Sequence, residues 1–127
     1  MIKSKYISHI LDLLLDGDDL GKKARLQVGF LTEKHFEYTG VGLFVSFNHS
    51  EGIEQYRLTE DKTVINGVEI RSTELEIAAE AMVHTVNGLI DYLEIWSYNG
   101  EYPIRELTNY KLTQVWLNGR GREIEES

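Results

Sequence analysis

The chain has 127 residues, of which 42% are hydrophobic and 27% are charged, and its formal net charge is −8. Such a length and composition predict one globular domain, without an apolar run of about 18 residues that would cross a membrane. Cysteine is absent, which excludes disulfides and thiolate metal sites. The acidic balance disfavours nucleic acid and anionic membranes as partners, since both attract Lys and Arg, and it favours a basic protein partner.

The N-terminal segment predicts an amphipathic helix over residues 4–16. Its apolar side chains recur at helical spacing on one face, namely Tyr6, Ile7, Ile10, Leu11, Leu14 and Leu15. Ser4 is a suitable N-cap for this helix and Gly17 a suitable stop. The segment lacks the small-residue cleavage site of a secretory signal, so we expect a cytoplasmic protein.

The pattern between residues 20 and 47 changes from ambiguous to β-like. Leu26, Val28 and Phe30 alternate as in a strand, although the neighbouring apolar residues also allow a short helix before it. From about residue 36 the alternation of a strand becomes clear. A further strand places on one face Leu43, Val45 and Phe47, with Phe44 on the other.

Asn-Gly dipeptides predict tight turns at residues 66–67, 87–88 and 99–100. A two-residue turn at 87–88 would fix the register of a hairpin and place His84 opposite Asp91. Residues 110–117 are typical of a final strand, so we expect a domain over 1–117 followed by a flexible, charged tail over 118–127.

These elements together predict an α+β fold. The N-terminal amphipathic helix is expected to pack on a curved, mainly antiparallel β-sheet that is built from hairpins. Such a sheet leaves open which face of the 79–98 hairpin is buried.

Catalytic and metal-binding motifs are missing from the sequence. The four histidines form neither an HExxH motif nor a close ligand cluster, and there is no nucleophile elbow or phosphate-binding glycine loop. We therefore expect no enzymatic activity, metal or cofactor. One alternative is a small enzyme or small-ligand-binding protein, with His84, Asp91 and Glu94 at the mouth of a pocket between helix and sheet.

Two acidic segments are candidate contacts for a basic partner. Asp16, Asp18 and Asp19 lie at the end of the predicted helix, and Glu51 and Glu54 lie in a polar loop. Carboxylates at these positions would steer a basic protein and pair with its Arg and Lys side chains.

A strand face rich in aromatic side chains is a further candidate contact, formed by Ile90, Tyr92, Glu94, Trp96 and Tyr98. Trp and Tyr are favoured anchors of protein interfaces, and a carboxylate among them could receive an arginine. The alternative is that these aromatic residues are buried in the core.

Two runs of the sequence carry a family resemblance. Residues 38–45 read Tyr-Thr-Gly-Val-Gly-Leu-Phe-Val, and residues 87–98 read Asn-Gly-Leu-Ile-Asp-Tyr-Leu-Glu-Ile-Trp-Ser-Tyr, shortly before Gly-Glu-Tyr-Pro at 100–103. These runs resemble small bacterial proteins of uncharacterised function, some of which are similar to immunity proteins of contact-dependent or polymorphic toxin systems. The resemblance implies an antiparallel sheet with an N-terminal helix and no catalysis.

The leading hypothesis is therefore a non-catalytic, acidic binding protein, with a toxin domain as the basic partner whose active site it occludes. A third hypothesis is a self-associating structural module, in which edge strands pair to form a homodimer.

Overall fold

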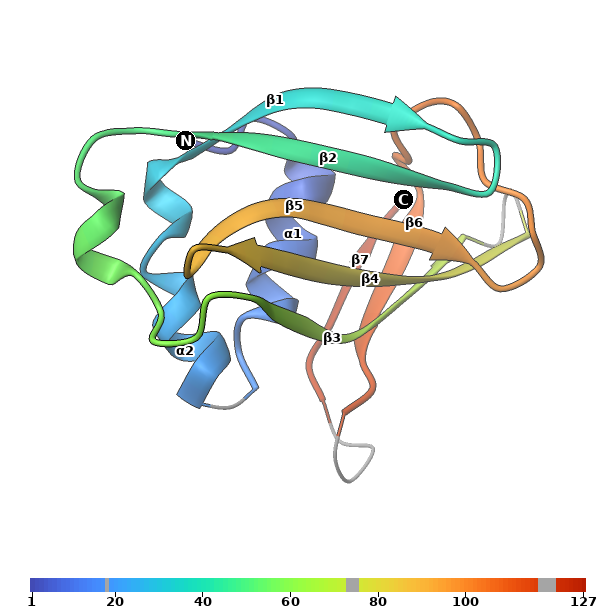
Figure 1. The fold of residues 1–127 in the computed structure, drawn as a ribbon. Helices are drawn as coiled ribbons and strands as arrows, with labels where there is room; N and C mark the ends of the chain where they lie inside the picture. The colour runs from blue at the N-terminus through green and yellow to red at the C-terminus, as the bar shows by residue number, and fades with distance from the viewer. Residues whose placement is uncertain (18, 73–75, 117–120) are drawn as a thin grey trace.

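The computed structural model describes residues 1–17, 19–72, 76–116 and 121–127. Helix α1 (Lys5–Leu14) packs against one face of a seven-stranded antiparallel sheet (Figure 1). The sheet is curved and is not closed into a barrel, which confirms the expected α+β fold class.

The strands follow the order β1-β2-β5-β4-β3-β6-β7 across the sheet. Their bounds are β1 (Leu31–Tyr38), β2 (Gly42–His49), β3 (Thr63–Ser72), β4 (Ile77–Val86), β5 (Leu89–Ser97), β6 (Tyr110–Gln114) and β7 (Glu123–Glu126). The helical segments besides α1 are α2 (Asp19–Arg25) and two 3₁₀ turns, η1 (Val28–Phe30) and η2 (Ile53–Tyr56). Every pair of neighbouring strands in this sheet is antiparallel.

Helix α1 forms where its capping and periodicity predicted it. The Ser4 hydroxyl accepts a hydrogen bond from the Ile7 amide at 3.1 Å. The helix ends at Leu14, with Leu15 as C-cap, two residues before the predicted end. Its apolar stripe is buried with almost no solvent exposure and builds the core together with the inner face of the sheet.

The opposite, outer face of the sheet has no helix of the described residues packed on it. Alternation along each strand separates the two faces. In β2, for example, Leu43 and Val45 are buried whereas Phe44 is exposed. The outer face is therefore a broad, open surface.

Residues 26–30 do not form the strand that their alternation suggested. Helix α2 ends at Arg25, a turn and η1 occupy residues 26–30, and the strand β1 begins only at Leu31. Leu26 is 56% exposed, while the intervening polar residue Gln27 is fully buried. Burial here follows the needs of the turn rather than the alternation of apolar residues.

The turn predicted at Asn66–Gly67 is also wrong. Strand β3 passes straight through this dipeptide, and its register to β4 shifts between Asn66 and Val68. Gly67 has a φ of +111°, so it supplies the left-handed conformation of a β-bulge. The hairpin at Asn87–Gly88 is confirmed: there both residues have positive φ, as a type I′ turn requires.

The predicted flexible tail is wrong for its last residues. Residues 123–126 form β7, which pairs with β6, and Ile124 packs against the core. Lys5 and Glu126 form an ion pair at 2.9 Å that joins this strand to α1. Strand β6 is accordingly shorter than the predicted strand and is not the last one.

Candidate functional site

The outer face carries four aromatic side chains on β2, β5 and the turn that follows β5. Phe44 is 36%, Trp96 38% and Tyr98 44% exposed, and Tyr92 is half-buried. The ring centroids of Phe44 and Tyr92 are 6.1 Å apart, and those of Trp96 and Tyr98 are 5.0 Å apart in an edge-on arrangement. The alternative that these rings belong to the core is wrong, because β5 turns Leu93 and Ile95 inward instead.

Carboxylates alternate with these aromatic residues across the strands. The register places Glu94 beside Phe44 on one side, and Trp96 beside Glu80 on the other. The Tyr98 hydroxyl donates to Glu80 at 3.2 Å. We use the name outer aromatic face for Phe44, Tyr92, Trp96 and Tyr98 together with the carboxylates Glu37, Glu80, Asp91 and Glu94.

A shallow, open hollow of about 360 Å³ lies within the outer aromatic face. Its lining residues come from β1, β2 and β5 and are His35, Glu37, Phe44, Ser46, Asp91 and Tyr92. Polar and aromatic groups thus face the same small space, although Asp91 and Glu37 lie far apart in the sequence.

His84 pairs with a different carboxylate from the one predicted. Its Nε2 lies 2.8 Å from Oε1 of Glu94, and its ring stacks on Tyr92 with centroids 4.3 Å apart. The hairpin register follows the prediction up to Thr85 and Ile90 and then shifts, so that His84 lies opposite Tyr92 and Asp91 is left without a cross-strand partner. This β-bulge, which no turn rule anticipates, makes the predicted His84–Asp91 pair wrong.

The three residues predicted at the mouth of a pocket between helix and sheet do not lie there. His84, Asp91 and Glu94 lie on the outer aromatic face, on the side of the sheet away from α1. A cavity of about 220 Å³ does lie near the end of α1, but its lining is mainly apolar, with Leu14, Gly17, Leu20, Val64, Ile65, Asn66 and Trp116. Among the described residues, no group of three or more His, Asp or Glu is placed to hold a metal ion.

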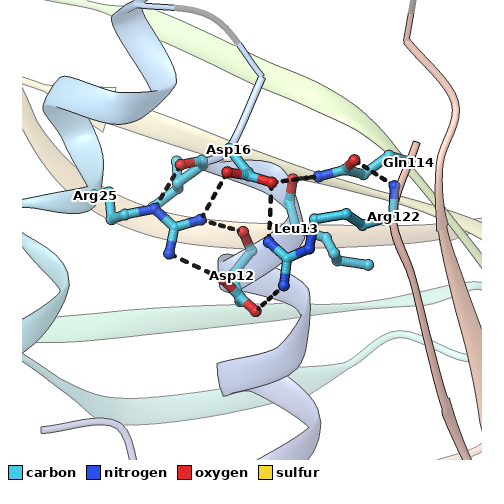
Figure 2. A network of polar contacts seen from close by, with 7 residues as sticks. Asp12, Leu13, Asp16, Arg25, Gln114 and Arg122 are labelled. Carbon is cyan, nitrogen blue, oxygen red and sulfur yellow. Dashed lines mark hydrogen bonds and ion pairs between the residues drawn. The ribbon is translucent and has the colours of Figure 1, made fainter. Parts of the chain in front are cut away.

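The acidic end of α1 is joined to the chain's own arginines (Figure 2). Arg122, just before β7, donates to Asp16 at 2.9 Å and to Asp12 at 3.0 Å. Arg25 of α2 donates to Asp12 at 2.9 Å. The Gln114 amide completes the network, at 3.2 Å from Asp16. We call Asp12, Asp16, Arg25, Arg122 and Gln114 the arginine clasp.

The arginine clasp shifts the titration of both carboxyl groups. For Asp16, hydrogen bonds from Arg122 lower the pKa, against a smaller opposing effect of burial. For Asp12, burial acts to raise the pKa, but hydrogen bonds from Arg122 and Arg25 outweigh it and bring the pKa below its ordinary value. Asp16 is therefore ionised and already paired within the chain.

The other predicted acidic contacts are placed differently. Asp19 is exposed at the start of α2, and Glu51 and Glu54 are exposed before and within η2. Asp18 lies outside the described residues. In contrast to Asp16, these three described carboxylates remain accessible to a partner.

Comparison with protein-family models, with curated proteins and with solved structures gives no match. In the described part of the chain, none of the helices is both long and apolar enough to cross a membrane. The function must therefore be argued from the chemistry of the surface.

The sequence indicated the aromatic side of β5, but it did not indicate what surrounds it. Phe44 was visible as the residue on the opposite face of its strand, and Glu37 gave no signal. Their positions beside Tyr92 and Asp91 depend on the order β1-β2-β5 and on bulges in two strands.

Proposed function

We propose that this chain is a non-catalytic binding protein that takes a basic protein partner on the outer aromatic face. The observation that supports this proposal is the alternation of exposed aromatic rings with carboxylates on an open sheet face. Rigid aromatic side chains supply contact area at a small cost in conformational entropy, and carboxylates among them select a cationic partner.

The electrostatics of the whole chain favour the same kind of partner. A net charge of −8 attracts a basic protein over distances of about the Debye length, near 10 Å at moderate salt. Asp16, one of the predicted contacts, is already paired with Arg122 within the arginine clasp. The outer aromatic face offers both charge and anchoring groups, whereas Asp19, Glu51 and Glu54 offer charge.

The more specific form of the proposal is an immunity protein in the cytoplasm whose partner is a toxin domain. The two runs that resemble small bacterial proteins, some of them similar to immunity proteins, contribute β2 and β5, which are neighbours in the sheet. Phe44 from the first run and Trp96 from the second both belong to the outer aromatic face. A toxin that presents its active site to this face would have that site occluded.

Affinity capture from a lysate of the source organism tests the proposal. We expect the tagged chain to retain one basic protein at low salt and to release it at high salt. Purified partner is then titrated with variants of the chain. Trp96→Ala and Phe44→Ala should each weaken binding about tenfold or more, as truncated interface anchors do.

Two matched controls test whether the loss of affinity is specific to the outer aromatic face. Ile104→Ala removes an exposed apolar side chain in the loop before β6 and should leave affinity unchanged. Glu37→Lys on the outer aromatic face should weaken binding more than Glu54→Lys in η2. The reverse order would move the interface to the acidic loop and overturn the proposal.

The toxin form is tested separately by adding the chain to the purified partner in an assay of that partner's toxicity. Stoichiometric inhibition supports the immunity role. A partner that keeps full activity when saturated with the chain refutes that role and leaves the binding function in place.

A further inference from the structure

We propose that the hollow of the outer aromatic face is a subsite for one arginine side chain of the partner. The guanidinium would lie in the hollow against the rings of Phe44 and Tyr92 and pair with Glu37 and Asp91. This inference builds on the proposed function, because it names the group that a basic partner inserts at this point of the face.

The hollow is built by two β-bulges on either side of β2. In β1 the register to β2 shifts between Glu33 and His35, which leaves Lys34 as the extra residue. In β5 the register to β4 shifts at Asp91. Both irregularities adjoin Ser46, which pairs with His35 on one side and with Tyr92 on the other.

The hollow consequently has a small residue at its base and larger residues around it. Ser46 has a short side chain, and the residues that line the hollow around it are aromatic or carry longer polar groups. Bulges redirect side chains and are common beside functional sites. Here the bulge in β5 coincides with the residue that brings a carboxylate, Asp91, into the lining of the hollow.

The two carboxylates of the hollow lack internal partners. Among the described residues, neither Glu37 nor Asp91 forms a hydrogen bond or ion pair through its side chain. Glu94, close by, is bonded to His84, and Glu69 on the same sheet is paired with Arg71. The hollow therefore holds two carboxylates without an internal partner beside two aromatic rings.

This chemistry fits arginine better than lysine. A guanidinium is planar, stacks on aromatic faces and directs several N–H donors outward in its plane. It can thus contact both rings and reach two carboxylates at once, with the Ser46 hydroxyl as a further acceptor. A lysine ammonium is a compact, strongly hydrated charge that gains less from the rings.

The test uses N-acetyl-argininamide as the probe and the whole chain, observed by two-dimensional NMR. Titration should shift the amide signals of Ser46, Asp91 and Tyr92 more than those of η2 or α2. N-acetyl-lysinamide should bind about threefold more weakly. Each of Glu37→Gln and Asp91→Asn should weaken argininamide binding about threefold, and the double variant about tenfold.

Glu54→Gln and Glu123→Gln remove the same charge at exposed positions elsewhere and should leave the titration unchanged. The inference is overturned if the shifts are absent from the hollow, if lysinamide binds equally well, or if the folded double variant binds as the parent does.

The experiment also separates this inference from the proposed function. Probe binding at the hollow, without any protein partner that depends on the outer aromatic face, supports the subsite and refutes the function. A partner whose affinity depends on Trp96 but is unchanged in the double variant of Glu37 and Asp91 supports the function and refutes the subsite.

Discussion

Gln27 is a buried polar residue whose side chain joins three backbone groups. Its amide nitrogen donates to the carbonyl oxygens of Tyr56 at 2.9 Å and Gly88 at 3.0 Å. Its oxygen accepts from the Ile90 amide at 2.7 Å. One side chain thus connects the end of η2 with the hairpin that begins β5.

We predict that Gln27→Leu lowers the free energy of unfolding by roughly 2–3 kcal/mol, because it leaves buried backbone groups without partners. Urea denaturation at neutral pH measures the change. The matched control is Gln55→Leu, since Gln55 is exposed and bonds to Gly52 within the same turn. Equal losses in the two variants would show that the buried hydrogen bonds of Gln27 stabilise the fold no more than the exposed hydrogen bond of Gln55.

Among the secondary-structure elements, those with an uninterrupted period were predictable from the sequence. The stripe of α1 and the alternation of β2 each satisfy one geometry over their whole length. The Asn87–Gly88 turn was predictable because both residues favour positive φ. Asn66–Gly67 has the same letters, but only Gly67 has positive φ, so the chain makes a bulge there and continues.

The remaining features depend on contacts between distant segments. Strand β7 is charged at three of its four positions and gives no strand signal of its own. It forms because β6 offers an edge and because Arg122 and Glu126 form ion pairs with Asp12 and Lys5 of α1. The hollow similarly required the strand order, which the sequence left undetermined.

The arginine clasp predicts an acid-dependent attachment of the β6–β7 hairpin to α1. Hydrogen bonds from arginines lower the pKa values of Asp12 and Asp16. A carboxyl group whose pKa is lowered on folding stabilises the native state above its unfolded pKa, near 4, and loses this contribution as pH falls further. We therefore expect Arg122→Gln to reduce the free energy of unfolding at pH 7. The loss should be only about 1 kcal/mol, because the Arg122 side chain is 52% exposed and its ion pairs are screened by solvent.

Urea unfolding between pH 7 and pH 3 measures this effect. The parent should lose more stability than Arg122→Gln as pH falls through 4, so the two curves converge in acid. Lys111→Gln, which removes a cation of β6 that faces Glu123, should run parallel to the parent. Curves for Arg122→Gln that stay parallel to the parent down to pH 3 would contradict the assignment.

For the whole molecule, one face of the sheet is packed and the other is open and negatively charged. The two tryptophans report on these environments separately. Trp96 stands at 38% exposure on the outer aromatic face, beside Glu80 in the register, whereas Trp116 lines the cavity near the end of α1. Carboxylates around an exposed ring raise the local concentration of cations and lower that of anions.

We predict that Trp96 fluorescence, isolated in a Trp116→Phe variant, is quenched more by caesium and less by iodide than its solvent access alone would give. Quenching by acrylamide, which is neutral, measures that access. Each quenching constant is expressed relative to that of free N-acetyl-tryptophanamide. The caesium-to-iodide ratio should be several-fold above that reference at low ionic strength and should fall toward it in high salt, because screening shortens the range of the field.

Replacing both Glu80 and Glu94 by Gln should lower the ratio, and replacing both Glu51 and Glu54 by Gln should change it less. A ratio for Trp96 no higher than that of the free analogue would mean that the face carries no local negative field, and steering of a basic partner would have to come from the net charge alone.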